Sequence, residues 1–385
     1  MSGLMNSFDF MESIAPRIIA GIKPYFDGLL RSDSETGKLF LFDDELDNRA
    51  SCCTTAAAAV FYAWEGRRNA SEASRTIALA LTEEVRRRQL ASGGFGQPFY
   101  IKKGEPDIVD IAEVGASADS LYHLHRVADS SAARESLIRS AEYLLTQVAP
   151  QNPAVIFKRP GEDFDVLNGD MYAARTFCRA YALSGNPVYL EKLKQIFVHL
   201  ADRFGRNESG WWPYIENWDG SVVMGNSVAY QATIIELAHS SLPLLDEELR
   251  NRWNDVAAEA METMLGAMKE PPSEETEAPW WARDWNNSSE INLALWHCGG
   301  PELKEIAMKR FAETADRLAE QGIAVFKPVI VNDVPDRTPV TTTFRKAAGF
   351  AGMIANIALA PEYGLSETQT DSQNRLIENK GGISL

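Results

Sequence analysis

The chain has 385 residues, of which 45% are hydrophobic and 24% charged, values typical of a protein with a large core. Its formal net charge is −16 at pH 7, and its sequence pI is about 4.9. A surface this negative repels nucleic acid and anionic lipid, so we expect neither as a partner. No apolar stretch reaches the roughly 18 residues of a membrane span. Stable insertion is therefore not expected, and only transient membrane contact remains open.

The N-terminus and the cysteines bear on location. MSGLMNSFDFMESIAPRI carries acids early and lacks a basic segment followed by an apolar run, so we expect no secretory signal. The four cysteines, at positions 52, 53, 178 and 298, show neither a disulfide spacing nor a CxxC pattern. Both features predict a cytoplasmic protein. Motifs for nucleotides, zinc or magnesium diphosphate are also missing, so no metal and no cofactor is expected.

Helical periodicity, capping residues and breakers predict about twelve helices. The first covers residues 7–31, and two kinds of helix then alternate along the chain. Ala-rich, weakly charged helices are expected at 51–65, 110–128, 168–184, 224–241, 287–298 and 342–360. Charged amphipathic helices are expected at 70–90, 131–148, 187–204, 245–269 and 301–321. The best candidate for an extended segment is IAVFKPVIV at 323–331.

Five helical hairpins with short turns recur at intervals of roughly 55–60 residues. One such hairpin cannot bury its apolar face alone, so neighbouring hairpins must stack. Helices that are apolar nearly all round belong to an inner layer, and amphipathic helices to an outer layer. With the helix at 7–31 counted in the outer layer, there are six helices of each kind, which predict an all-α, closed (α/α)6 toroid, a double-layered helical barrel; an open solenoid is the alternative. We expect one domain over 1–365 and a polar tail at 366–385.

The connections differ in length. Those from a charged helix to the next Ala-rich helix are long, whereas the turns within a hairpin take only a few residues. All the long loops must then emerge on one face of the ring, beside the N-termini of the inner helices. Loops longer than about 12–15 residues usually have a function. The sequence therefore predicts a site at this mouth of the central cavity.

Carboxylates are concentrated where the second inner helix begins. PDIVDIAEVGAS places Asp107, Asp110 and Glu113 three residues apart, so Asp110 and Glu113 share one face of the helix. Clustered carboxylates raise one another's pKa, and one of them can then remain protonated and act as an acid. The alternative is a capping role, because acids are favoured in the first turn of any helix.

The starts of other inner helices are polar as well. LNGDMY contributes Asn168, Asp170 and Tyr172, of which Asp170 is a second acid, an orienting group or a cap. Tyr230 and Arg345 stand near the starts of the fourth and sixth inner helices. Two loops, GWWPYIENW and PWWARDW, hold six of the nine tryptophans. Aromatic side chains around a cavity stack on sugar faces or stabilise carbocations, and the residues leave both options open.

Two short motifs carry a family resemblance. RRQLASGGFGQ resembles the Gln- and Gly-rich turns repeated in squalene cyclases and prenyltransferases, and SGWWPY is similar to an equivalent turn. Within that terpenoid cyclase α/α-toroid superfamily, the chain is most similar to a monodomain class II terpene cyclase of the merosterolic acid synthase type, over roughly residues 50–360. The family's DxDD motif is absent, and DIVDIAE stands in its place.

This resemblance implies metal-independent cyclisation of a hydrophobic, prenylated substrate, started by protonation. Asp110 would donate the proton, Asp107 or Glu113 would tune its pKa, and Arg345 or Arg283 would hold a carboxylate at the substrate head. The residues expected to bind the substrate are Trp64, Tyr122, Asn168, Asp170, Tyr172, Trp212, Tyr230, Trp285, Phe344 and Arg345.

A second resemblance is to (α/α)6 carbohydrate enzymes, namely glycoside hydrolases, uronyl epimerases and lyases. NGDMYAARTFCRAYALSGNPVYLEK followed by SGWWPY is similar to their hairpins. It would make Asp110 and Asp170 an acid/base pair at glycosidase separation. A noncatalytic scaffold is the third option. A deep, dry pocket lined with aromatic residues and a single buried acid would favour cyclisation, whereas an open groove with two exposed carboxylates and several basic groups would favour sugar chemistry.

Overall fold

The structure, a computed structural model, describes residues 7–99, 106–268, 289–327 and 342–359. Within these ranges it has twelve α-helices in two layers. The inner helices are α2 (Cys52–Arg68), α4 (Ile111–Ala128), α6 (Leu167–Ser184), α8 (Val228–His239), α10 (Ser289–Cys298) and α12 (Thr343–Leu359). The outer helices are α1 (Ser7–Leu29), α3 (Glu72–Arg88), α5 (Ser131–Thr146), α7 (Pro187–Arg203), α9 (Glu247–Ala267) and α11 (Gly300–Gln321).

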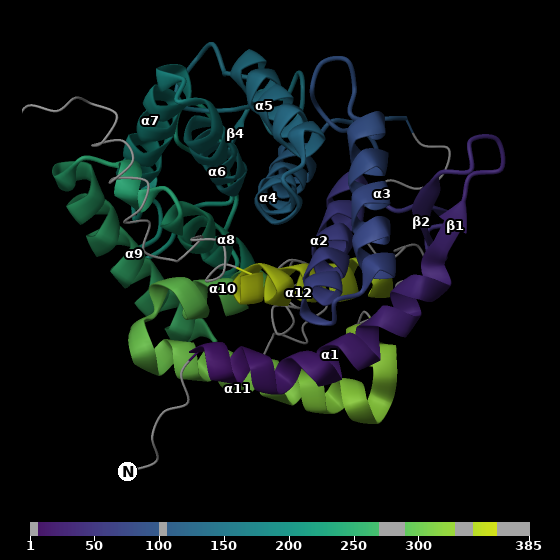
Figure 1. The fold of residues 1–385 in the computed structure, drawn as a ribbon. Helices are drawn as coiled ribbons and strands as arrows, with labels where there is room; N and C mark the ends of the chain where they lie inside the picture. Colours follow the sequence, from purple (N-terminus) through teal and green to yellow (C-terminus); the bar gives the residue numbers. More distant parts are fainter. Residues whose placement is uncertain (1–6, 100–105, 269–288, 328–341, 360–385) are drawn as a thin grey trace, which may run out of the picture.

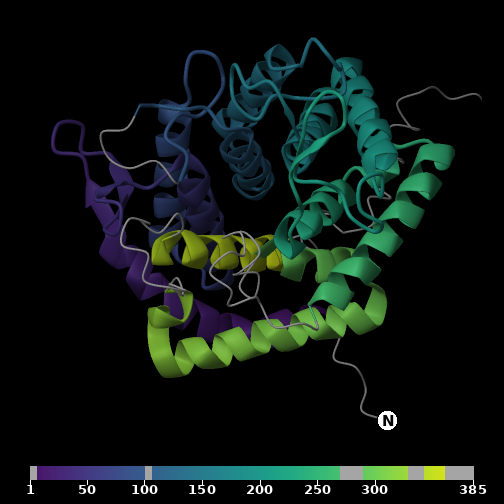
Figure 2. The same ribbon diagram turned by 180° about the vertical axis from the view of Figure 1, so that it is seen from behind.

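The inner helices form a closed ring (Figure 1). Each packs against the next one along the chain, and α12 packs against α2, so the last inner helix meets the first. Most outer helices pack on the inner helix of their own hairpin, while α1 packs on α11 and α12. Seen from behind, α1 again lies beside α11 (Figure 2). The N-terminal helix is therefore the outer partner of the C-terminal inner helix.

The composition of α2 and α3 explains the two layers. Both helices have 17 residues, of which 14 are buried in α2 and 6 in α3. The small side chains of α2 let its neighbours approach closely: a Cβ added to Gly352 of α12 would lie 3.0 Å from the Cβ of Ala57. The charged residues of α3 leave one apolar stripe, which packs inward while the opposite face meets solvent. Small residues thus select the inner positions.

Short strands organise the long loops. One antiparallel sheet contains β1 (Leu30–Ser32), β2 (Leu39–Asp43) and β3 (Asn48–Arg49), and a second contains β4 (Asp165–Val166), β5 (Ile215–Glu216) and β6 (Val222–Met224). The loops are tied to the starts of inner helices. The Ile111 N–H donates to the Lys158 carbonyl at 2.9 Å, and the Leu167 N–H donates to the Tyr214 carbonyl at 3.2 Å. These two loops therefore lie at the N-terminal side of the ring.

The predicted double-layered (α/α)6 ring is confirmed, with inner and outer helices as expected. The extended segment at 323–331 is wrong in its described part, since Gly322–Phe326 is a short 3₁₀-helix. The cause is packing. Val325 and Phe326 are buried in the core, and a turn directly after α11 places both side chains there. The short strands were not expected. The predicted tail at 366–385 lies outside the described residues, and the domain boundary at 365 stays a prediction.

Among the described helices, none is both long and apolar enough to span a bilayer. The predicted cytoplasmic location stays a prediction.

Candidate functional site

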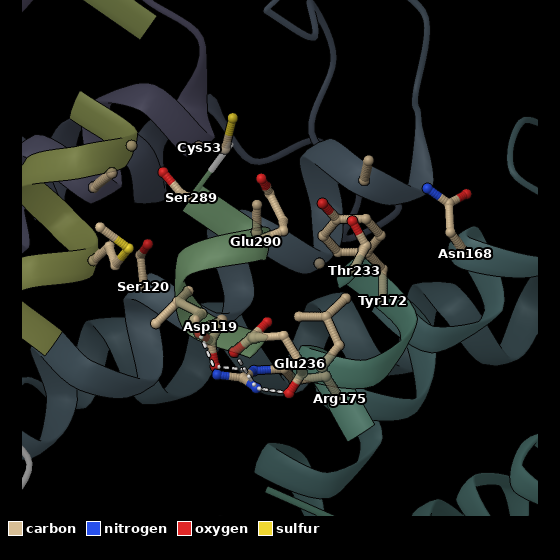
Figure 3. Close-up of a pocket in the computed structure, with 18 of the residues that line it drawn as sticks. Cys53, Asp119, Ser120, Asn168, Tyr172, Arg175, Thr233, Glu236, Ser289 and Glu290 are labelled. Atoms are coloured by element: carbon tan, nitrogen blue, oxygen red, sulfur yellow. Dashed lines mark hydrogen bonds and ion pairs between the residues drawn. The ribbon is translucent and has the colours of Figure 1, made fainter. Parts of the chain in front are cut away.

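The ring encloses a cavity of about 680 Å³, a size typical of small-molecule sites. Its wall is built from all six inner helices, with Phe99, Lys158, Arg159 and Tyr214 added by loops. Residues from the first turns of the inner helices form its N-terminal end, and residues two or more turns further along form its C-terminal end. Figure 3 shows side chains from both ends converging on the same space.

Two arginines and one aspartate form an ion-pair cluster at the C-terminal end. Arg175 of α6 donates from Nε to Asp119 Oδ1 at 2.9 Å and from Nη2 to Oδ2 at 3.1 Å. Arg179, one turn later, donates from Nε to Asp119 Oδ1 at 3.0 Å. Burial alone would raise the pKa of Asp119, but the two guanidinium groups outweigh it and hold that pKa far below its usual range. Asp119 is therefore a fixed anion that positions both arginines.

Glu236 of α8 lies beside this cluster and lines the same cavity. Its Oε1 is 3.1 Å from Arg175 Nη1 and 3.9 Å from His297 Nδ1. Figure 3 shows Arg175 between Asp119 and Glu236. Burial raises the pKa of Glu236 to about 7; Arg175 opposes this rise, while the negative charges of Asp119 and Glu290 add to it. Glu236 can thus take up or release a proton near neutral pH.

Three histidines complete the C-terminal end. The rings of His239 and His297 stack, with centroids 5.1 Å apart and planes 12° apart. Burial lowers the pKa of His297 well below its usual value, and the neighbouring His239 and Arg175 lower it further. Burial also lowers the pKa of His123 to about 3, although Asp119 opposes the shift. His123 and His297 are therefore neutral at physiological pH and can serve as hydrogen-bonding groups for a polar ligand.

Tyrosines and a lysine shape the N-terminal end. Tyr214 and Tyr230 stack with centroids 4.1 Å apart and planes 18° apart. Lys158 Nζ donates to the Tyr214 hydroxyl at 2.9 Å. Burial raises the pKa of Tyr172 well above its usual value, so its hydroxyl is neutral and can donate a hydrogen bond. This end offers flat aromatic faces together with donors.

Five of the predicted site residues line the cavity, namely Asp110, Asn168, Tyr172, Tyr230 and Arg345. Asp110 is the N-cap of α4: its Oδ1 accepts the Ala112 N–H at 2.9 Å, and its Oδ2 accepts Arg159 Nε at 3.1 Å. The capping alternative therefore describes the geometry of Asp110. Whether any of the five acts on a substrate stays a prediction.

The predicted acids beside Asp110 are placed differently. Asp107 is exposed in the loop before α4 and is not part of the cavity wall. Glu113 is buried behind the wall, where its Oε1 accepts the Cys53 N–H at 2.7 Å and its Oε2 accepts the Phe99 N–H at 3.3 Å. Glu113 thus joins α4 to the start of α2. The three carboxylates therefore do not cluster: Asp107 lies in the exposed loop before α4, Asp110 caps the helix, and Glu113 is directed toward the start of α2.

The large aromatic residues expected in the cavity mostly pack elsewhere. Trp64 contacts Phe61 within α2, and Phe344 packs edge-on against Phe26 of α1 at 5.3 Å between centroids. Trp212 is buried between α7 and α9, where its Nε1 donates to the Leu200 carbonyl at 2.8 Å. Tyr122 lies beneath the Arg179 guanidinium at 4.2 Å and so supports the wall from behind. Trp285 lies outside the described residues.

Asp170 belongs to a second buried cluster outside the cavity wall, where β4, α6 and α7 meet. One ligand atom each from Asp165, Asp170 and His199 lies within 4.8 Å of the others, a spacing that metal ligands can adopt. His199 Nε2 is 2.7 Å from Asp165 Oδ2 and 4.0 Å from Asp170 Oδ2. The predicted pairing of Asp110 and Asp170 across the cavity is not formed, since Asp170 does not line it.

Asn152 fixes which nitrogen of His199 carries the hydrogen. Asn152 Oδ1 accepts the Ala154 N–H at 3.0 Å, so its Nδ2 faces His199 Nδ1 at 3.3 Å as a donor. His199 Nδ1 must then accept, and Nε2 must carry the hydrogen that it donates to Asp165. A metal ion would need the lone pair on Nε2. The geometry therefore favours a hydrogen-bonded cluster over a metal site.

One proton completes this cluster. Asp165 Oδ1 and Asp170 Oδ2 are buried and accept no hydrogen bond from another described donor. Burial raises the pKa of Asp170 well above its usual value, and the negative charge of Asp165 raises it further. A protonated Asp170 donates to Asp165, which satisfies both oxygens. We call Asp165, Asp170, His199 and Asn152 the sealed cluster.

The charged groups at the C-terminal end of the cavity were missed at the level of sequence. Their signal is present in RTFCR, where Arg175 and Arg179 stand four residues apart on a helix that is otherwise nearly apolar. A charged residue on a helix buried on both sides must face either a partner or a cavity. The same reasoning would have identified Asp119 and Glu236.

Comparison with known proteins identifies the fold. No protein-family model and no curated protein sequence matches the chain. Solved structures do match: a family 76 glycoside hydrolase from a bovine Bacteroides thetaiotaomicron strain has a TM-score of 0.61 and 10% identity, covering 93% of this chain and 78% of its own. Cellobiose 2-epimerase from Bacillus thermoamylovorans B4167 has a TM-score of 0.58 and 13% identity, and the match covers 80% of this chain and 87% of the epimerase. An unsaturated glucuronyl hydrolase from Streptococcus agalactiae has a TM-score of 0.57 and 11% identity, and the match covers 92% of this chain and 93% of the hydrolase.

These similarities establish the (α/α)6 toroid. The more specific resemblance to a terpene cyclase finds no support in them. The cavity itself also argues against that interpretation, because a carbocation is stabilised by aromatic faces in an apolar space. The C-terminal end instead holds two arginines and a fixed aspartate.

Proposed function

We propose that the protein is an enzyme that acts on a carbohydrate by acid–base chemistry, and that it isomerises or epimerises a sugar. The observation that carries this proposal is the position of Glu236 on the cavity wall, between Arg175 and His297 and with a pKa of about 7. A general base works best when its pKa lies near the working pH. The comparisons support the substrate class, since the matched structures include a cellobiose 2-epimerase.

The wall suits a sugar in composition. Hydroxyl-rich ligands need many donors and acceptors together with flat apolar faces, and the cavity supplies both. Neutral imidazoles and arginines lie at its C-terminal end, while Tyr214 and Tyr230 form a stacked pair at its N-terminal end. The hydrophobic prenylated substrate expected from the sequence would leave these polar groups without partners, at a cost in binding free energy.

The proposed reaction moves one proton. Glu236, as a carboxylate, removes the proton from the carbon next to the carbonyl group of an open-chain sugar. The electron pair of that C–H bond moves onto the carbonyl oxygen and gives an enediolate, whose negative charge Arg179 can stabilise, since it lines the wall and Asp119 holds its Nε. Rotation about the bond between C2 and C3 turns the opposite face of the enediolate toward Glu236, and return of the proton to the same carbon then gives an epimer. Return to the neighbouring carbon, with the hydroxyl proton passing from one oxygen of the enediolate to the other, gives the ketose or aldose isomer.

Hydrolysis of a glycoside is a second candidate, because a second carboxylate, that of Glu290, also lines the cavity and its charge raises the pKa of Glu236. Two carboxyl groups that face one cavity are what a glycosidase requires.

The test is solvent exchange. The protein is incubated in D₂O with D-glucose, D-mannose, cellobiose and D-glucuronate, and proton NMR follows the loss of the signal at C2 and the formation of isomers. We expect exchange with at least one of these sugars, and its loss in Glu236→Gln. Glu305→Gln, which makes the same change on the exposed surface of α11, serves as the control and should leave exchange intact.

Release of free sugar from aryl glycosides without exchange at C2 would show that hydrolysis is the correct class. Exchange that persists in Glu236→Gln would overturn the assigned role of Glu236. Absence of both reactions across these substrates would overturn the proposal as a whole.

A further inference from the structure

Arg345 is a cation on the cavity wall whose direct partners are all neutral. Its Nη1 is 2.6 Å from Cys53 Sγ and 3.4 Å from Thr54 Oγ1, and its guanidinium carbon lies 4.1 Å above the Phe99 ring. Within the described part of the chain, Arg345 forms no ion pair. The other cavity arginines differ in this respect, since Asp110 pairs with Arg159, and Asp119 with Arg175 and Arg179.

The Cys53 contact does not supply a counter-charge. Burial raises the pKa of the Cys53 thiol, with Arg345 opposing that rise, so the sulfur is neutral at physiological pH. Its hydrogen is directed at Glu113 Oε2, 2.9 Å away. Glu113 is in turn occupied by the Cys53 and Phe99 N–H groups. Glu113 and Glu290 act on Arg345 only through space, where they favour its charged form.

A guanidinium group needs an anion once a ligand displaces water from the cavity. Removing it from solvent with neutral partners only is unfavourable, and a carboxylate or phosphate that meets its planar fork in bidentate fashion offsets that cost. Phe99 supports one face of the group, so its hydrogen-bonding edge has a fixed direction. Arg345 is therefore prepared for an anionic ligand group.

A second cation lies at the same end of the cavity. Lys158 Nζ is held by the Tyr214 hydroxyl at 2.9 Å and lies 4.0 Å from Asp110 Oδ2, an oxygen already bound by Arg159. The chain as a whole carries a formal charge of −16, so cations gathered on one part of the cavity wall run against its overall composition. Their position fits a ligand that brings negative charge into the cavity.

We propose that the sugar bound in this cavity is acidic and that Arg345 binds its anionic group. The inference rests on the proposed carbohydrate function and names the substrate class for that site. The shared chemistry is an oxyanion on a sugar, either the carboxylate of a uronic acid or the phosphate of a sugar phosphate. Arg345 holds the oxyanion at the N-terminal end, and the remaining sugar atoms extend toward Glu236.

The test measures affinity by isothermal titration calorimetry with D-glucuronate, D-glucose 6-phosphate and D-glucose. We expect the wild-type protein to bind at least one of the two acids more tightly than glucose. Arg345→Gln should weaken the binding of that acid about 10- to 100-fold, as expected for the loss of hydrogen bonds to a charged group. The affinity for glucose should not change. Tighter binding of the glucuronate identifies a carboxylate, and tighter binding of the phosphate ester identifies a phosphate.

Two further variants separate charge from folding. Arg345→Lys keeps the charge and should retain part of the preference for the acid. Lys309→Gln removes one exposed positive charge on α11 and should retain all of it. Three results would each overturn the inference. The wild-type protein could bind glucose and both acids with equal affinity, or it could bind neither acid. Arg345→Gln could also weaken the binding of glucose and of the acid equally.

The outcome does not depend on turnover, and this keeps the two proposals distinguishable. Glu236→Gln should keep the preference for the acid, because Glu236 does not contact the oxyanion in this arrangement. A protein that prefers the acid but catalyses no exchange at C2 would contradict only the proposed reaction. A protein that epimerises a neutral sugar, and whose ligand affinities do not change in Arg345→Gln, would contradict only the inference about the acid.

Discussion

Two buried clusters of this molecule contain the same kinds of groups and differ in how completely those groups are satisfied. The sealed cluster holds carboxylates and a histidine, and the C-terminal end of the cavity holds carboxylates, arginines and histidines. Burial raises the pKa of Asp170 in the first and of Glu236 in the second. A shifted pKa therefore does not separate the two, although such shifts often mark functional sites.

The hydrogen-bond partners of the carboxylates do distinguish the two clusters. In the sealed cluster, Asp170 Oδ1 accepts the Ile156 N–H at 2.7 Å, and a single proton satisfies Asp165 Oδ1 and Asp170 Oδ2. Glu236 Oε1 lies near Arg175 but accepts no hydrogen bond from a described donor, and Glu236 lines the cavity. What distinguishes the candidate catalytic carboxylate is its place on a cavity wall, whereas the acids of the sealed cluster can satisfy one another away from that wall.

The most direct test of this difference is to replace each acid in turn by its amide. Glu236→Gln should lower turnover about 10²- to 10⁴-fold, the usual contribution of a general base. Asp170→Asn should leave turnover within a factor of a few, because its effect is confined to the sealed cluster. Initial rates on the substrate found by C2 exchange measure both. A large loss of rate in Asp170→Asn would show that the sealed cluster takes part in catalysis.

Asp170 offers a matched test of stability. Asp170→Ala should lower the free energy of unfolding by about 1–3 kcal/mol, because it leaves Asp165 Oδ1 and the Ile156 N–H without a partner in a buried site. Asp170→Asn should be nearly neutral, since its Oδ1 can accept from Ile156 and its Nδ2 can donate to Asp165, as the protonated acid does. Urea unfolding monitored by circular dichroism gives both values. Equal destabilisation by the two substitutions would refute the shared proton.

The assigned tautomer of His199 can be reversed. In Asn152→Asp, one carboxylate oxygen can still accept the Ala154 N–H while the other accepts a hydrogen from His199 Nδ1, which frees Nε2 to bind a metal. We expect this variant to bind Zn²⁺ about 10- to 100-fold more tightly than the wild-type protein, the range typical for groups that orient a metal ligand. Competition with a chromogenic chelator measures the difference. Tight Zn²⁺ binding by the wild-type protein would contradict the assigned tautomer.

The pH profile should report Glu236. If the carboxylate is the active form, kcat/KM falls tenfold per pH unit below about 7 and levels off above it. His123 and His297, whose pKa values are lowered, should add no limb near neutrality. The wild-type profile between pH 5 and 9 measures this, and the residual activity of Glu236→Gln should lose the limb near pH 7. A limb that persists in the variant belongs to another group.

The same shift predicts a smaller effect on stability. The folded-state pKa of Glu236 is raised from 4.5 to about 7, so the folded protein holds this proton more tightly than the unfolded chain does. The corresponding stabilisation is complete below about pH 4.5 and is lost as the pH rises through 7. The difference in unfolding free energy between wild type and Glu236→Gln, followed over this range, isolates the contribution of Glu236.

The fold was largely predictable because each hairpin repeats the same physical pattern. Small apolar residues such as those of 51–65 indicate helices buried on both sides, and charged faces such as those of 70–90 indicate the outer layer. Short strands escaped prediction because β4 and β5 have two residues each, too few to show an alternating pattern. Their pairing depends on loops that are far apart in the sequence.

The candidate site was predictable only at its N-terminal end. Asp110, Asn168 and Arg345 were found because polar residues at helix starts are conspicuous in the sequence. Glu236 lies two turns into an apolar helix, and which direction such a side chain faces depends on how six helices pack around one axis. The tryptophans misled for the complementary reason: Trp212 fills the space between α7 and α9, and its loop position in the sequence does not reveal this.

The pairing of α1 with α11 and α12 has a consequence for biosynthesis. The Thr342 hydroxyl donates to Asp43 Oδ2 at 2.6 Å across a separation of 299 residues, and α1 itself rests on helices from the far end of the chain. A ribosome adds about 5–20 residues per second, so α1 waits on the order of tens of seconds for its partners α11 and α12. During that time the isoleucines and phenylalanines that α1 buries in the folded ring lack their partners, and such exposed apolar surface favours aggregation until the ring can close.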